Sequence, residues 1–290
     1  MTAIDGLDPT TLVVTTVFSL VPAILFLWWG FKPMGARIDV WAQARGVPLT
    51  DETRPSVTAR LHRARRWRTV GFTLGWLAPY AHLWLTRSAF DQPSLGYLTL
   101  VGYVVAALCA ELSSPRRSST SGAAELSVRD VERYLPTAAR KWVHVVAGAS
   151  VAATAANALL PQRPAGGSPD AGGFALGTVV VLALLVAAEI LPRIVVRHAQ
   201  PFHSSDLLTA DDALRSWSAH AVVGALLASM LFVLSRQVMQ LGSESNLQLL
   251  RWTGPVTGAL LFVLGIVAFQ SLSGYDWRWH VSRRPERQPR

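Results

Sequence analysis

Long apolar stretches without formal charge alternate along the chain with shorter segments in which the charged residues gather. Seven apolar stretches could cross about 30 Å of hydrocarbon as helices that rise about 1.5 Å per residue. A segment in lipid must pair its own backbone polar groups, and a helix does so. The pattern predicts an all-α membrane protein, a bundle of about seven transmembrane helices over residues 11–31, 69–86, 92–110, 142–160, 171–191, 216–235 and 252–274.

The composition agrees with this pattern. Hydrophobic residues make up 51% of the chain and charged residues 16%, whereas a soluble domain usually has about 25% charged residues. The loops between the stretches are short for separate folded domains. We therefore expect a single transmembrane domain over residues 1–274, followed by a basic cytoplasmic tail over residues 275–290.

The positions of the basic residues predict the orientation. With the N-terminus outside, 23 of the 27 Lys and Arg residues lie in segments on the cytoplasmic side, as the positive-inside rule requires. We expect a multi-pass protein of the cell membrane with its N-terminus outside and its C-terminus in the cytoplasm. The net charge of +9 is explained by this asymmetry, so nucleic acid is not an expected partner.

A two-helix unit recurs three times, followed by a lone seventh helix. In each unit a proline stop ends the first helix, a hydroxyl-and-acid signal starts the next one, and a tryptophan opens the return helix. The prolines are Pro33, Pro115 and Pro192, and the tryptophans are Trp67, Trp142 and Trp217. The pattern is typical of three parallel repeats, but any cytoplasmic hairpin needs the same signals, and both interpretations remain open.

Two acids at the inner ends of predicted spans, Glu111 and Glu189, are candidate functional residues because an acid in lipid is costly. His144 and His220 are expected at a similar depth and titrate near neutral pH. With Arg193 these residues could form one polar cluster at the inner membrane face. The alternatives are structural salt bridges, such as Glu189 with Arg193 four residues on, and interfacial histidines bonded to carbonyls.

The segment before the second span is a basic helix. We expect its arginines to contact anionic lipid headgroups, although they could serve topology alone. These residues are Arg60, Arg63, Arg65, Arg66 and Arg68. Trp67, Trp142 and Trp217 are expected to anchor the helices at the interface.

Two stretches carry small residues four positions apart, Gly71 with Gly75 and Gly254 with Gly258. Small residues at this spacing let two helices approach closely. The sequence predicts two packing faces but does not separate a contact within the chain from a dimer.

Reaction motifs are missing from the sequence. It has no Gly-rich phosphate loop, no Gly-x-Ser-x-Gly elbow and no His-Glu-x-x-His segment, so neither a cofactor nor a metal is expected. The leading hypothesis is a non-enzymatic transport-related or accessory membrane subunit that meets a protein partner at its cytoplasmic loops. The alternatives are a membrane-embedded enzyme acting on a lipid, and a structural or regulatory membrane scaffold.

Overall fold

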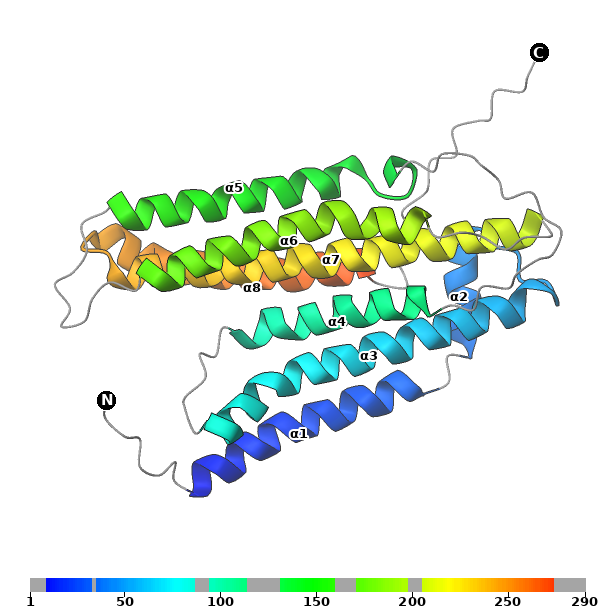
Figure 1. Ribbon diagram of the computed structural model, residues 1–290, viewed down its shortest axis with the longest axis horizontal. Coiled ribbons are helices and arrows are strands. Elements are labelled where there is room, and N and C mark those ends of the chain that lie inside the picture. Colours follow the sequence, from blue (N-terminus) through cyan, green and yellow to red (C-terminus); the bar gives the residue numbers. More distant parts are fainter. Residues whose placement is uncertain are drawn as a thin grey trace, which may run out of the picture.

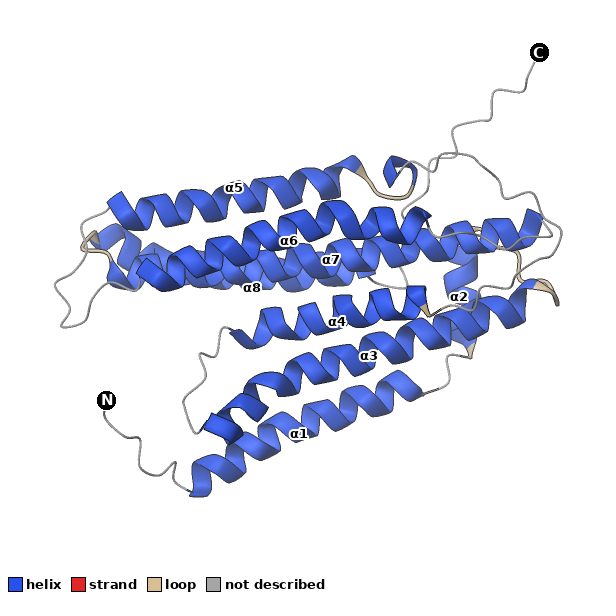
Figure 2. Cartoon of the chain, in the orientation of Figure 1, coloured by secondary structure: helices blue, strands red, loops and turns tan. Residues whose placement is uncertain are grey.

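The computed structural model describes residues 9–32, 35–86, 94–113, 131–159, 171–197 and 205–273. Every regular element in these ranges is helical (Figure 2), which confirms the predicted all-α class. The predicted basic tail, residues 275–290, lies outside the described residues. The elements are α1 (Pro9–Phe31), α2 (Ala36–Arg45), α3 (Thr53–Thr86), α4 (Ser94–Leu112), the 3-10 turn η1 (Val131–Arg133), α5 (Thr137–Leu159), α6 (Ala171–Arg197), α7 (Ser205–Glu244) and α8 (Gln248–Ser273).

Each of the seven apolar stretches falls on a different helix. Within the described ranges, four helices are long and apolar enough to cross a membrane, namely α5, α6, α7 and α8. The apolar parts found in α1 and α4 are shorter, at Ser19–Phe31 and Leu98–Leu112. Four of the described helices could therefore cross a membrane, which agrees with a membrane location, and a count of seven remains a proposal.

Pro192 does not end a helix, contrary to the sequence prediction, because α6 continues to Arg197. Pro22, Pro79 and Pro255 likewise lie inside helices. A proline removes one backbone hydrogen bond, but neighbouring helices can hold the chain in helical form around it.

Helix α7 is the central helix of the molecule. It packs against α3, α4, α5, α6 and α8 (Figure 1), and 94% of its most apolar 18-residue stretch is buried. Only 11% of the corresponding stretch of α8 is buried. A helix that is hydrophobic on all sides is typically buried in a core. The apolar outer faces of α1, α6 and α8 are exposed and could contact lipid.

The two predicted small-residue faces are contacts within the chain. A Cβ atom at Gly71 or Gly75 would collide with the backbone of α4 at Gly102 or Leu98. A Cβ atom at Gly254 would lie 2.7 Å from the Cα of Gly242 on α7. The backbones of α3 and α4, and of α7 and α8, therefore approach closely because these positions lack side chains.

A second hydrophobic core, which we call the α2 core, lies at one end of the bundle. It joins α2 to the first halves of α3 and α7, which extend beyond their predicted spans (Figure 1). At about 1.5 Å per residue the 34 residues of α3 and the 40 of α7 are longer than a bilayer is thick. The residues of the α2 core are Ile38, Trp41, Ala42, Val47, Val57, Leu61, Ala64, Ala110, Ala210, Leu214 and Trp217.

Local signals hold α2 and α3 in place. Helix α2 ends at Gly46, whose φ of 62° suits a left-handed C-cap. The Thr53 N–H donates to the Thr50 hydroxyl, and the Thr50 N–H donates to the Thr53 hydroxyl. Thr50, Asp51 and Glu52 are the first of the three hydroxyl-and-acid signals that predict helix starts, and this reciprocal bonding satisfies free amides where α3 begins.

The predicted repeat is not reproduced by the packing. Helices α1 and α3 pack together, as do α6 and α7, but α4 packs on α3 and α7 while α5 packs on α6 and α7. The return-helix tryptophans also differ, because Trp142 is 58% exposed and Trp217 only 3%. The shared signals are explained as well by the needs of a hairpin at an interface.

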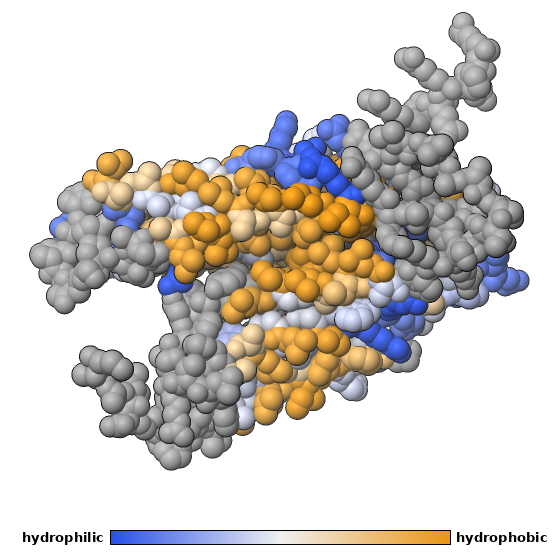
Figure 3. All heavy atoms as spheres, in the orientation of Figure 1, coloured by the Kyte–Doolittle hydropathy of each residue, from blue (hydrophilic) through white to orange (hydrophobic). Residues whose placement is uncertain are grey.

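The surface shows the same polarity as the sequence. Apolar residues cover the middle of the helices in Figure 3, and hydrophilic residues gather toward the end where α2 lies. This distribution is typical of helices whose middle parts face hydrocarbon and whose ends face water.

Candidate functional site

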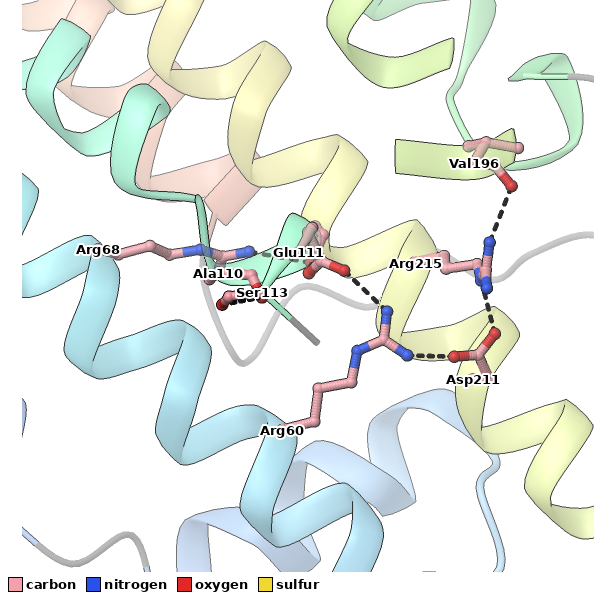
Figure 4. A network of polar contacts seen from close by, with 9 residues as sticks. Arg60, Arg68, Ala110, Glu111, Ser113, Val196, Asp211 and Arg215 are labelled. Atoms are coloured by element: carbon pink, nitrogen blue, oxygen red, sulfur yellow. Dashed lines mark hydrogen bonds and ion pairs between the residues drawn. The ribbon is translucent and has the colours of Figure 1, made fainter. Parts of the chain in front are cut away.

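A buried group of charges, which we call the Arg60 network, joins three helices beside the α2 core (Figure 4). The Arg60 guanidinium of α3 donates from Nη2 to Glu111 Oε2 of α4 at 2.8 Å. Its Nη1 donates to Asp211 Oδ1 of α7. One arginine side chain therefore bridges carboxylates from two helices that are far apart in the sequence.

Arg68, two turns after Arg60 on α3, extends the network. Its Nη2 donates to the Ser218 hydroxyl at 3.1 Å, and that hydroxyl donates to Glu111 Oε1 at 2.5 Å. The guanidinium also stacks on the Trp217 ring, 3.9 Å from its centroid, a contact in which the ring face attracts the cation. Both oxygens of Glu111 are thus bonded.

Arg215 connects the network to the end of α6. Its Nε donates to Asp211 Oδ2 at 2.5 Å and its Nη1 to the Val196 carbonyl at 3.0 Å. The last carbonyls of a helix have no partner within the helix and carry a partial negative charge. Arg215, whose side chain is 2% exposed, caps the C-terminal end of α6 from α7.

The charges of the network hold one another in the ionised state. Burial alone would lower the pKa of the Arg60 guanidinium, but the carboxylates of Glu111 and Asp211 raise it above its usual value. A buried charge is tolerated only when it is paired and hydrogen-bonded. The geometry therefore fixes the relative positions of α3, α4 and α7 and leaves the two carboxylates occupied.

A separate group surrounds Glu189 where α5 begins and α6 ends, and we call it the Glu189 cluster. Arg140 and Arg193 both donate to Glu189 Oε2, at 3.0 and 2.8 Å. His144 Nε2 lies 3.8 Å from Glu189 Oε1. These side chains are partly exposed, so solvent screens their interactions more than those of the Arg60 network.

The single predicted polar cluster is thus two groups. The structure brings Glu189, His144 and Arg193 together and places Glu111 in the Arg60 network. His220 belongs to neither, because its Nδ1 bonds the Ser216 carbonyl one turn earlier at 2.7 Å. The predicted pairing of Glu189 with Arg193 is confirmed, and Glu111 pairs with Arg60, a partner that the sequence does not predict.

The five arginines predicted at lipid headgroups have different surroundings. Arg60 and Arg68 belong to the Arg60 network, and Arg65 donates to the Trp29 and Lys32 carbonyls at the end of α1. Arg63 and Arg66 instead line a surface groove beside Phe31. The structure places only these two where a headgroup can reach them, because the other three are held inside the protein.

The tryptophans divide in the same way. Trp67 and Trp142 are exposed, as an interfacial anchor must be, but Trp217 is buried in the α2 core. A buried indole that stacks on Arg68 packs the interior, so for Trp217 the prediction of an interfacial anchor is wrong.

Sequence reasoning missed three members of the network, Asp211, Arg215 and Ser218. Asp211 and Arg215 are four residues apart, the spacing at which opposite charges on a helix meet. That spacing is a usable signal, but Asp211 also belongs to the third helix-start signal, Thr209 with Asp211 and Asp212, which predicts it in the first turn of the helix. The helix in fact begins at Ser205, so Asp211 lies inside it and faces α3.

Within the described residues, no three His, Cys, Asp or Glu side chains come together as a metal site would require. Comparisons of the chain with protein families, with curated proteins and with solved structures gave no match.

Proposed function

We propose that the chain is a non-enzymatic accessory membrane subunit that presents an ordered cytoplasmic surface to a protein partner. The observation that carries the proposal is the α2 core, a helical unit at the end of the bundle, beyond the predicted spans. The Arg60 network fixes this unit to α4 and α7. A rigid surface lowers the entropy cost of binding a partner.

The transport-related part of the proposal concerns what the partner does. An adjacent transport machine would supply the energy and the translocation path, and this chain would supply a fixed docking surface. The proposed orientation, with the α2 core in the cytoplasm, agrees with the basic character of the segments around it.

Site-specific photo-crosslinking in cells tests the proposal. A photoreactive amino acid at Val40, which is 49% exposed on α2, should give one discrete adduct with a second protein. The matched control is Leu249, which is 73% exposed at the start of α8 and lies at the opposite end of the bundle. It should give no such adduct.

Mass spectrometry of the adduct identifies the partner. With the photoreactive amino acid moved to Gln43, which is exposed one turn further on α2, a Val40→Asp change should abolish the adduct while the chain stays in the membrane. Equal adducts at both positions, or none at Val40 and at neighbouring positions of α2, would contradict a partner surface on the α2 core. A partner with an ATPase or permease sequence would support the transport-related role.

A second candidate is a membrane enzyme acting on a lipid, and the Glu189 cluster favours it. A carboxylate beside a histidine can orient that histidine as a general base, and two arginines could bind a phosphate. His144 is partly exposed near the start of α5, within reach of a headgroup. A purified protein that turns over a phospholipid, and loses turnover in His144→Ala but not in His220→Ala, would establish this function instead.

A further inference from the structure

A basic groove lies between the end of α1 and α3. We call it the Arg66 groove; it is open to the surface, with a volume of about 670 Å³. Its lining residues are Phe31, Ala59, His62, Arg63, Arg66 and Trp67. The positions on α3 recur every three or four residues, so they share one face of that helix.

Among the residues that the structure describes, no carboxylate lies within ion-pair distance of Arg63 or Arg66. By contrast, Arg60 on the same helix bridges two carboxylates. The groove therefore carries a positive potential that no described carboxylate neutralises, which favours an anion.

His62 responds to that potential. Burial, together with the charges of Arg66 and Arg65, lowers the pKa of the imidazole below its ordinary value. An anion in the groove would oppose the effect of the two arginines, so it would raise this pKa. The titration of His62 thus agrees with the excess of positive charge around it.

The groove lies where a lipid headgroup would be. Trp67 comes two residues before the predicted span over residues 69–86, and Phe31 closes the span over residues 11–31. Both rings are exposed, and aromatic rings of this kind settle at the level of headgroups. The exposed apolar face of α1, with Trp28 and Ile24, continues from the groove and would contact acyl chains.

We propose that the Arg66 groove binds the phosphate of an anionic phospholipid, with Arg63 and Arg66 as its ligands and the acyl chains along α1. Guanidinium groups match the geometry of phosphate oxygens. The exposed apolar face of α1 that continues from the groove favours a lipid over the free anion. This inference does not depend on the partner proposed for the α2 core.

Native mass spectrometry of the full chain in a neutral detergent tests the site. Phosphatidylglycerol added in increasing amounts should bind as discrete adducts, more tightly than phosphatidylcholine. The double variant Arg63→Gln/Arg66→Gln should bind phosphatidylglycerol roughly 30-fold more weakly. The control Arg54→Gln/Arg251→Gln removes the same charge at exposed positions outside the groove and should bind as the wild type does.

Three outcomes would overturn the proposal. The Arg63/Arg66 variant could keep its affinity while circular dichroism shows an intact helical fold. The control could lose affinity equally, which would indicate general attraction of charge. Inorganic phosphate at equal concentration could displace the lipid, which would assign the groove to a soluble anion.

Discussion

At the scale of single residues, the molecule separates buried charges from exposed ones. Glu111 accepts bonds on both oxygens and its side chain is 8% exposed, while Asp39 and Arg54 form an exposed pair at 2.7 Å. Breaking a buried pair leaves an unpaired charge in a medium that cannot solvate it, whereas water takes over for an exposed one. An ion pair therefore contributes very differently to the stability of the fold at the two places.

We expect Glu111→Gln to lower the free energy of unfolding by about 3 kcal/mol or more, because Arg60 would keep its charge inside the protein with one carboxylate fewer. Thermal unfolding in detergent measures the effect. The matched variant Asp39→Asn should change stability by less than about 1 kcal/mol.

Replacing both partners measures the interaction between Arg60 and Glu111 apart from their contacts with other residues. In the double variant Arg60→Met/Glu111→Gln, the loss should be smaller than the sum of the two single losses, since neither charge is left alone. Additive losses would show that Arg60 and Glu111 do not stabilise each other.

At the scale of elements, the helices are held by close backbone approach and by internal polar groups, of which Gln237 is an example. Gly71 on α3 and Gly102 on α4 face each other without side chains. Gln237 on α7 accepts from the Ser150 hydroxyl at 2.6 Å and donates to the Thr178 hydroxyl at 3.1 Å, which joins α5, α6 and α7. Such contacts provide association in lipid, where apolar burial alone gives no driving force.

We expect Gly71→Val to separate α3 from α4, because a side chain there meets the backbone of α4. The transition temperature should fall, and α3–α4 cysteine crosslinks placed on a Cys109→Ser background should be lost. Gly148→Ala is the control: nothing lies within 4 Å of its added Cβ, so stability should be unchanged or slightly raised. A tolerated Gly71→Val would contradict the close approach.

Gln237→Leu should destabilise the chain by about 1 kcal/mol, since interhelical hydrogen bonds in membranes contribute modestly and the Ser150 hydroxyl would lose its acceptor. Reversible unfolding in mixed micelles measures the difference. Leu249→Ala, at an exposed position of α8, should have no effect. A Gln237→Leu variant as stable as the wild type would show that this polar group does not hold the three helices together.

At the scale of the whole molecule, two groups of helices meet along the central helix. Helices α1, α3 and α4 form one group, and α5, α6, α7 and α8 form the other (Figure 1). The α2 core and the Arg60 network connect the groups at one end. Charge is thus concentrated where the predicted cytoplasmic loops leave the bundle.

The proposed topology of seven spans places the two termini on opposite sides of the membrane. In intact cells, a tag at the N-terminus of the protein should be accessible to an added protease. A tag at its C-terminus should be protected until the cells are lysed. Tags with equal accessibility would require an even number of spans. In that case α1 and α4, whose apolar parts are shorter, would be the first helices to reconsider as membrane spans.

The apolar pattern was enough to locate helices but not their full length. Each of the seven stretches coincides with a helix because hydrophobic length is a property of the sequence alone. The extension of α3 before residue 69 is the basic helix that the sequence predicts, whereas the extension of α7 before residue 216 lies outside the predicted spans, and both pack against α2. Tertiary contacts commonly override weak local preference.

By itself, the sequence determined the helical class, the presence of helices apolar enough to cross a membrane and the pairs that are local in the chain, such as Glu189 with Arg193. These depend on hydrophobicity and on spacings within one helix, which need no knowledge of the fold. The tertiary structure decided that Arg60 meets Glu111 and Asp211, that Trp217 is buried, and that Arg63 and Arg66 are left at the surface. The reason is physical: residues 51 and 151 positions apart become neighbours only when helices pack.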